Sequence, residues 1–122
     1  MKRDMDLVRK LLTFFDEKPG PEHVEVPPIE GYDDSTIKYH LVLLHDAELL
    51  RCEPVRSSTS DRVIYVIPFD LTWQGHEFIG KVKDERVWER VKNVVASKGG
   101  ALTFDVVSEI AKRIAFKVVA DV

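Results

Sequence analysis

One segment, residues 31–50 with the sequence GYDDSTIKYHLVLLHDAELL, constrains the fold more than any other part of the chain. The carboxylate of Asp33 is suited to accept a hydrogen bond from the free N–H groups of a first helical turn, so a helix is expected to begin there. Ile37, Leu41 and Leu44 follow at the spacing i, i+4 and i+7, which places all three on one side of that helix. The segment therefore predicts a helix that packs through three aliphatic side chains and runs directly into an extended segment.

Two segments precede this helix. Residues 4–16 predict a first helix, because apolar residues recur on one face, namely Met5, Val8, Leu11, Leu12 and Phe15. The sequence KPGP at residues 18–21 ends it. Residues 23–30, HVEVPPIE, predict a short strand instead, because two adjacent prolines oppose a helix and valine alternates with polar residues. Val24 and Val26 are expected to pair as a third strand with the hairpin that follows.

That hairpin is predicted from residues 50–56 and 62–67, two β-type runs joined by the polar turn SSTSD. Pro68 is expected to end the second strand. A further helix follows Thr72, a suitable cap, and its apolar side is expected to hold Trp73, Phe78, Ile79 and Val82. Gly75 inside this helix costs up to about 1 kcal/mol relative to alanine, so we expect a close packing contact at that position.

Two more helices are predicted towards the C-terminal end. Asp84 is suited to cap a helix that ends at residues 98–100, and its apolar residues are Val87, Trp88, Val91, Val94 and Val95. The last helix starts near Thr103 and carries a stripe of Phe104, Val107, Ile110, Ala111, Ile114 and Val118. The predicted fold is therefore α+β and mostly helical, with a small two- or three-stranded antiparallel sheet and extra C-terminal helices.

Length and charge limit the broad class of protein. A chain of 122 residues with 44% hydrophobic content is expected to form one domain over residues 1–122, with a core at 1–82 and a helical extension at 84–120. The formal charge of −3 weighs against a broadly basic nucleic-acid-binding surface. The single Cys52 permits no internal disulfide, no apolar run could span a bilayer, and the opening MKRDMDL does not fit a signal peptide. We therefore expect a cytoplasmic protein without a membrane partner.

Several motifs resemble those of known proteins. Ser35-Thr36, His40-Leu41, Leu44 and Leu49-Leu50 follow the pattern of winged-helix regulators, and LTWQGHEF resembles the LTxxG motif that often comes after their wing. More closely, MKRDMDLVRKLL, the GY…YHL…LL segment, LTWQGHEF and VWERVK together resemble domain of unknown function 2513, an uncharacterised bacterial and phage-associated family. This resemblance implies a winged helix-turn-helix fold and no established activity. Glu48 stands where many winged-helix proteins have glycine, so a left-handed turn there is unfavourable.

The resemblance implies that double-stranded DNA is a partner, because in winged-helix regulators the outward side of the second helix enters a major groove. With Ile37, Leu41 and Leu44 inward, Ser35, Tyr39, Val42 and Asp46 face outward and Lys38 lies at the edge. The candidate DNA-binding residues are Ser35, Lys38 and Tyr39 on the helix and Arg56 and Arg62 in the wing. Against this hypothesis, Asp33, Asp34 and Asp46 would repel phosphates.

A protein partner is the alternative. Phe116 points away from the apolar stripe of the last helix, and Val119 lies near it. These two residues are the candidate partner interface, through which the C-terminal helix would form a homodimer. The same scaffold would then serve as a protein–protein interaction module without DNA binding.

No motif predicts an enzyme. His40 and His45 are five residues apart, which is unsuited to metal chelation on a helix, and the HE pair at His76 lacks a second histidine at position 80. His40 and His76 are better explained as packing or hydrogen-bonding residues, and Cys52 as a small buried side chain. We therefore predict a non-enzymatic winged-helix protein with no metal, cofactor or small-molecule substrate. It would be either a DNA-binding transcriptional regulator or accessory factor, or an interaction module.

Overall fold

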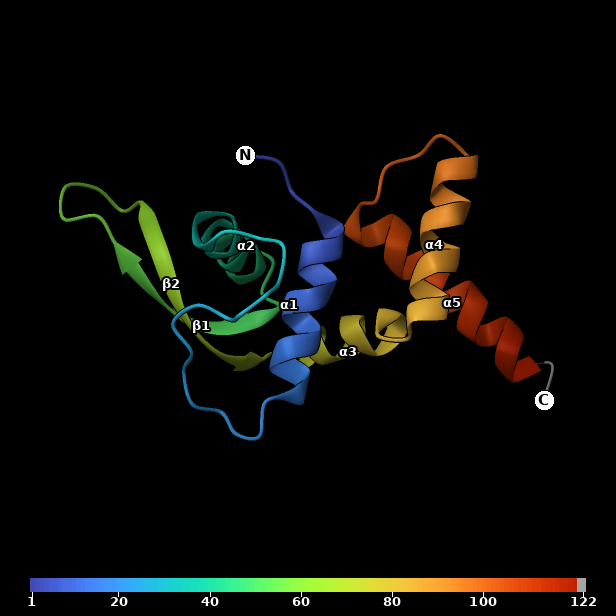
Figure 1. The fold of residues 1–122 in the computed structure, drawn as a ribbon, viewed down its shortest axis with the longest axis horizontal. Coiled ribbons are helices and arrows are strands. Elements are labelled where there is room, and N and C mark those ends of the chain that lie inside the picture. The colour runs from blue at the N-terminus through green and yellow to red at the C-terminus, as the bar shows by residue number, and fades with distance from the viewer. Residues whose placement is uncertain (121–122) are drawn as a thin grey trace. The chain divides into compact units, whose positions relative to one another are not determined.

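In its described residues the chain forms helices and a two-stranded antiparallel sheet, as expected for an α+β protein (Figure 1). The computed structural model describes residues 1–120, with side chains described as far as Ala115. Over these residues the order is α1 (Met5–Glu17), α2 (Asp34–Asp46), β1 (Leu50–Arg56), β2 (Val63–Leu71), α3 (Trp73–Val82), α4 (Glu85–Ser97) and α5 (Phe104–Ala120). The chain divides into two compact units, one covering Met1–His76 and the other beginning at Glu77. The prediction of a single domain stays a prediction.

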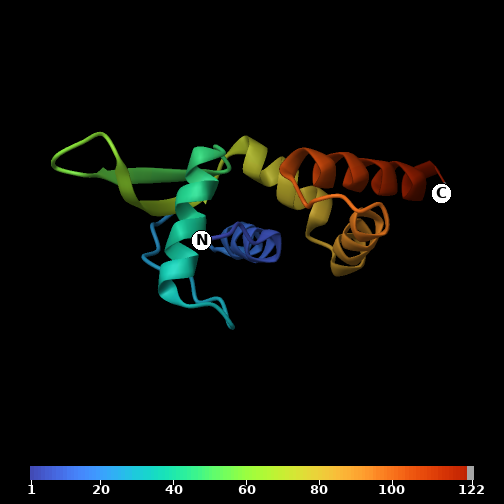
Figure 2. The same cartoon turned by 90° about the horizontal axis from the view of Figure 1, so that it is seen from above.

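The first unit is built on α1 and α2, which lie side by side in both views (Figures 1 and 2). Each helix begins at an aspartate, because the Asp4 carboxylate accepts a hydrogen bond from the Leu7 N–H at 3.2 Å and the Asp33 carboxylate accepts one from the Thr36 N–H at 2.8 Å. The predicted inward side of α2 is confirmed, since its three aliphatic residues Ile37, Leu41 and Leu44 are all buried. Burial of side chains at this spacing is what holds such a helix in place.

The connection between these helices corrects one prediction. Residues 21–30 contain no strand, so Val24 and Val26 do not add a third strand to the sheet. A single backbone hydrogen bond, from the Val24 N–H to the Pro68 carbonyl at 3.1 Å, joins this segment to the hairpin. Pro27 and Pro28 lack N–H groups, so the pairing cannot continue past them. The sheet is therefore two-stranded.

The β1–β2 hairpin packs one face inward. In its antiparallel register Leu50 pairs with Leu71 and Pro54 with Val66, and Leu50, Leu71 and Val66 are buried. Pro68 does not end β2, contrary to expectation, because the strand runs on to Leu71. The Pro68 carbonyl points away from β1, toward the Val24 N–H, so its nitrogen also points to the open edge and the missing N–H costs no pairing bond.

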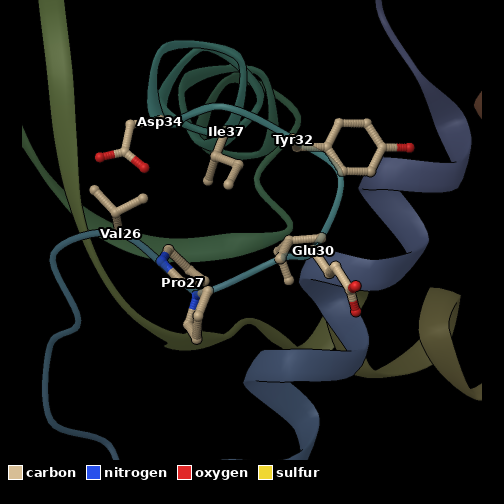
Figure 3. A pocket seen from close by; sticks show the side chains of 8 residues that line it. Val26, Pro27, Glu30, Tyr32, Asp34 and Ile37 are labelled. Atoms are coloured by element: carbon tan, nitrogen blue, oxygen red, sulfur yellow. The ribbon is translucent and has the colours of Figure 1, made fainter.

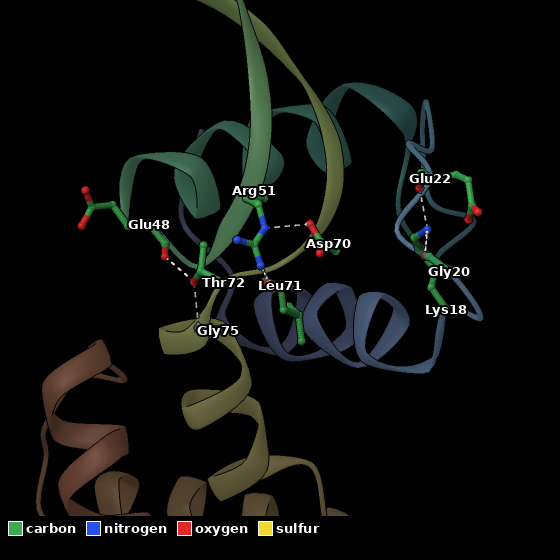
Figure 4. A network of polar contacts seen from close by, with 9 residues as sticks. All are labelled: Lys18, Gly20, Glu22, Glu48, Arg51, Asp70, Leu71, Thr72 and Gly75. Carbon is green, nitrogen blue, oxygen red and sulfur yellow. Dashed lines mark hydrogen bonds and ion pairs between the residues drawn. The ribbon is translucent and has the colours of Figure 1, made fainter.

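The end of α2 is held by a corner of hydrogen bonds (Figure 4). Glu48 adopts φ 60°, the left-handed conformation that the sequence makes unfavourable, and the Leu49 N–H returns to the Leu44 carbonyl at 2.9 Å. The Thr72 hydroxyl donates to the Glu48 carbonyl at 2.6 Å and accepts from the Gly75 N–H at 3.1 Å, which confirms Thr72 as the cap of α3. The corner thus joins the end of α2 to the start of α3.

Trp73 does not lie on the buried side of α3. Its side chain is 76% exposed, whereas Phe78, Ile79 and Val82 are buried. Trp73 lies five residues before Phe78, which turns it about 140° around the helix from that residue. Its inclusion in the apolar side was therefore an error of helical period.

The second unit contains the remaining predicted helices. Asp84 caps α4 as expected, because its carboxylate accepts hydrogen bonds from the Arg86 and Val87 N–H groups at 2.8 and 3.2 Å. The buried residues of α4 and α5 are Trp88, Val91 and Val95, and Val107, Ala111 and Ile114. Phe104 is more open than its place in the predicted stripe implies, but its ring stacks on Phe78 with centroids 4.6 Å apart. α4 thus buries the predicted side, and α5 does so between Val107 and Ile114, whereas the side chain of Val118 lies outside the described residues.

Gly75 should resist substitution because of the corner. A Cβ at this position would collide with the backbone carbonyl oxygen of Leu49, which cannot move as a side chain can. We expect Gly75→Ala to lower the free energy of unfolding by about 1–3 kcal/mol, measured by urea denaturation. The control is Gly80→Ala in the same helix, where a Cβ would meet nothing within 4 Å. That variant should gain up to about 1 kcal/mol, and equal effects at the two positions would contradict the packing argument.

Glu48→Gly should stabilise the protein. Glycine adopts a positive φ without the Cβ penalty, so we expect a gain of about 1 kcal/mol in the free energy of unfolding. Glu48→Ala removes the same exposed carboxylate and keeps the Cβ, so it should change stability by less than about 0.5 kcal/mol. Thermal denaturation of both variants checks this. A gain of the same size from alanine would show that charge, not backbone conformation, is responsible.

Candidate interaction surface

A buried histidine determines which side of α2 faces solvent. His40 is fully buried, its Nε2 accepts a hydrogen bond from the Asp4 backbone N–H at 2.8 Å, and its Nδ1 lies 2.9 Å from the Thr36 carbonyl oxygen. The ring therefore carries its proton on Nδ1 and is neutral in this arrangement. This confirms His40 as a packing and hydrogen-bonding residue. Because Asp4 is the cap of α1, the histidine links the start of α1 to the middle of α2.

Tyr32 extends this link. Its hydroxyl donates a hydrogen bond to the Asp4 carboxylate at 3.1 Å, and the Lys10 ammonium lies 5.5 Å from the centre of its ring. Burial, followed by the hydrogen bond to Asp4, raises the pKa of the Tyr32 phenol above its ordinary value. The turn that leads into α2 is thereby fixed to α1 at the same place as the histidine.

The solvent side of α2 carries more acid than base. Ser35 and Lys38 are exposed as predicted, and Tyr39 is half-buried, with its ring edge-on to His40 at 5.6 Å. Asp34 and Asp46 are also exposed. Asp33 and Glu48 add two more exposed carboxylates at the ends of the helix, whereas Lys38 is its single lysine or arginine. The helix therefore presents a predominantly negative surface.

The predicted hairpin residues form a separate group. Arg56 and Arg62 are both exposed near the turn of the hairpin, where the Ser57 N–H donates to the Arg62 carbonyl at 2.8 Å. The Arg56 guanidinium donates a hydrogen bond to the Asp61 carbonyl at 2.8 Å, so this side chain helps to stabilise the turn. Arg51, which the same strand carries, is paired with Asp70 at 3.1 Å. The candidate residues thus lie on two elements, three on α2 and two at the hairpin turn.

Large apolar side chains are exposed on the first unit, and the sequence analysis missed them. Ile64 and Tyr65 are 58% and 45% exposed on β2, and Trp73 is exposed at the start of α3. Val55 pairs with Tyr65 across the hairpin and is half-buried. A signal was present, because residues 63–67 read VIYVI and are apolar on both faces of the strand, where a half-buried strand should alternate.

The formal charge is unevenly distributed between the two units. Residues 1–76 contain nine lysines and arginines against fourteen aspartates and glutamates, a formal charge of −5. Residues 77–122 contain nine against seven, a formal charge of +2. The unit that contains the candidate DNA-binding residues is therefore the acidic one.

The remaining candidates show little sign of a reactive centre. Burial, and then the charge of Asp70, raise the pKa of the Cys52 thiol to about 12, so it stays protonated at neutral pH. His76 is exposed, with Nδ1 3.6 Å from the Asp16 carboxylate. Among the described side chains, no three of histidine, cysteine, aspartate and glutamate gather as metal ligands. None of the helices, as far as they are described, is long and apolar enough to cross a membrane.

The predicted partner residues on the last helix, Phe116 and Val119, have side chains outside the described residues. The homodimer contact is therefore left as a prediction.

The fold and surface together define an α+β protein in which a helix is followed directly by a two-stranded hairpin. Residues 2–101 match the family described as "Hypothetical protein (DUF2513)", and the chain belongs to this family. An uncharacterized protein of Haemophilus influenzae is 31% identical over 121 residues, which cover 98% of this chain and 100% of that protein. No solved structure matches the chain.

His40→Leu tests the link between α1 and α2. Leucine keeps an apolar side chain at the buried position but leaves the Asp4 N–H without its acceptor, so we expect the free energy of unfolding to fall by about 1–3 kcal/mol. Tyr39→Phe, at the next position of the same helix, should change it by less than about 0.5 kcal/mol. Chemical denaturation at neutral pH measures both. A stable His40→Leu variant would show that packing alone positions α2.

Proposed function

We propose that the protein is a non-enzymatic interaction module, which presents a winged-helix-like scaffold to another protein. One observation carries the proposal: the charged residues exposed on α2, where such a scaffold would read DNA, are one lysine, Lys38, and two carboxylates, those of Asp34 and Asp46. Exposed apolar side chains lie on the same unit, at Ile64, Tyr65 and Trp73. The surface is therefore better suited to a protein than to a polyanion.

The electrostatic argument against DNA concerns the first unit as a whole. Binding to a duplex gains free energy from the counterions released when lysines and arginines neutralise phosphates. Asp34 and Asp46 would oppose each phosphate contact made by Lys38, and the unit carries a formal charge of −5. Arg62 has few basic neighbours to assist it, because Arg51 is paired with Asp70 and Arg56 binds the turn.

The argument for a protein partner rests on the hairpin. Aromatic and arginine residues are enriched in protein interfaces, and exposed apolar residues gathered on one element are unusual on a monomer. Ile64 and Tyr65 are adjacent on β2 and therefore expose apolar side chains on opposite faces of the hairpin, and Arg62 lies two residues before Ile64. A partner that covers this end of the hairpin would bury the apolar side chains and pair with the arginine at the rim.

DNA binding as a transcriptional regulator or accessory factor is the second candidate function. It is favoured by the order of elements, a helix followed directly by a hairpin, with Ser35 and Lys38 exposed on the first and Arg62 on the second. Lys2 and Arg3, exposed before α1, would have to supply further phosphate contacts. The two functions differ in one measurable property, the dependence of binding on salt.

Fluorescence anisotropy with a labelled duplex of random sequence separates the two functions. We expect no saturable binding even at about 50 mM salt, because the first unit repels the duplex. Arg56→Glu with Arg62→Glu serves as the charge-reversal variant. Binding that weakens steeply with salt and is lost in this variant would overturn the proposal in favour of DNA.

The positive test uses affinity purification of the tagged full chain from the source cells. Ile64→Ser with Tyr65→Ser should lose a co-purifying protein, because the apolar surface is removed, while Lys38→Ala on α2 should retain it. Sedimentation of the purified chain shows whether that partner is a second copy. A partner that both variants retain would contradict the assignment of the hairpin as the interface.

A further inference from the structure

We propose that a hollow beside the start of α2 binds a lysine or arginine side chain of the partner protein, an inference that rests on the proposed interaction function. The hollow has a volume of about 470 Å³ and lies between the proline-containing connection and α2 (Figure 3). Its apolar lining comes from Val26, Pro27, Pro28 and Ile29 of the connection and Ile37 of α2. Pro27 and Ile37, which are buried, form its apolar base.

Two carboxylates border this apolar base. Glu30 and Asp34 are both lining residues and both exposed, and in Figure 3 they stand on opposite sides of the hollow. Among the described side chains, neither carboxylate has an ion-pair or hydrogen-bond partner. Asp33 differs, because hydrogen bonds from the side chain of Thr36 and then from its backbone N–H lower the pKa of the Asp33 carboxyl. The hollow therefore has two exposed carboxylates at its border, beside its apolar lining.

This combination selects the chemistry of the ligand. Lysine and arginine have aliphatic stems that pack on apolar surfaces and cationic heads that remain near water and carboxylates. An anion would be repelled from both sides, and a purely apolar side chain would leave the carboxylates unused. The N-terminus of α2 carries the partial positive charge of the helix dipole, which repels a cation. The full negative charges of Asp33 and Asp34 at the same end outweigh this partial charge.

The hollow also indicates how the cation is presented. Pro27 and Pro28 have no backbone N–H to donate, so the connection cannot pair with a strand of the partner at these positions. The partner would therefore be recognised through a side chain. The opposite side is preformed, because Tyr32 lines the hollow and is fixed to Asp4 by its hydroxyl. A preformed site loses little conformational entropy when it binds.

The test uses N-acetyl-arginine methylamide as the probe, titrated into the full chain and followed by NMR spectra of the backbone amides. We expect shifts concentrated at residues 26–37. The matched neutral probe is N-acetyl-citrulline methylamide, which has nearly the same shape without the charge. It should bind about tenfold more weakly, as expected for the loss of two partly exposed charge interactions.

Two double variants locate the charges. Glu30→Gln with Asp34→Asn should weaken arginine binding about tenfold, whereas Asp46→Asn with Glu48→Gln, at the other end of α2, removes the same charge and should leave it unchanged. Equal binding of the citrulline probe, shifts spread over the acidic surface, or equal loss in both variants would each overturn the inference. If the co-purifying partner is retained by Glu30→Gln with Asp34→Asn, the hollow fails as its contact while the interaction function stands.

Discussion

The hydrogen bond from the Asp4 backbone N–H to the buried imidazole of His40 determines how α2 is presented. The ring is fully buried and both of its nitrogens have partners, so a rotation of α2 would leave Asp4 and His40 unsatisfied in the interior. Ile37, three residues before the histidine, is held by the same constraint as the base of the hollow. The link between two helices thus also fixes the candidate surface.

The corner at the end of α2 determines where the hairpin begins. Glu48 accepts a left-handed backbone because its carbonyl receives the Thr72 hydroxyl, and the next carbonyl, of Leu49, receives the Thr72 N–H. One threonine thereby satisfies two backbone groups from the turn and caps α3 as well. The backbone strain is local, and the bonds that offset it join residues more than twenty positions apart, so the geometry depends on the whole hairpin being formed.

Features that depend on local chemistry could be predicted from the sequence. The inward side of α2 follows from helical spacing, and the caps at Asp33 and Thr72 follow from their oxygen atoms. Features set by distant partners could not be predicted. The sequence does not reveal that the Pro68 carbonyl meets Val24, or that His40 meets Asp4, because both depend on how separate elements pack. The hollow was missed for the same reason.

Asp34 has opposite consequences for the two functions that the scaffold could serve. On a DNA-reading helix its carboxylate, exposed in the first turn, would face phosphates and weaken binding. Beside the hollow, the same carboxylate is one of two that border an apolar lining, and it would favour a cation. Removing the Asp34 charge would raise the affinity of a DNA-binding surface for DNA. The same change would lower the affinity of a surface that binds a basic side chain. A cationic protein ligand would account for the acidic start of α2, whereas the same charge would weaken binding to a nucleic acid.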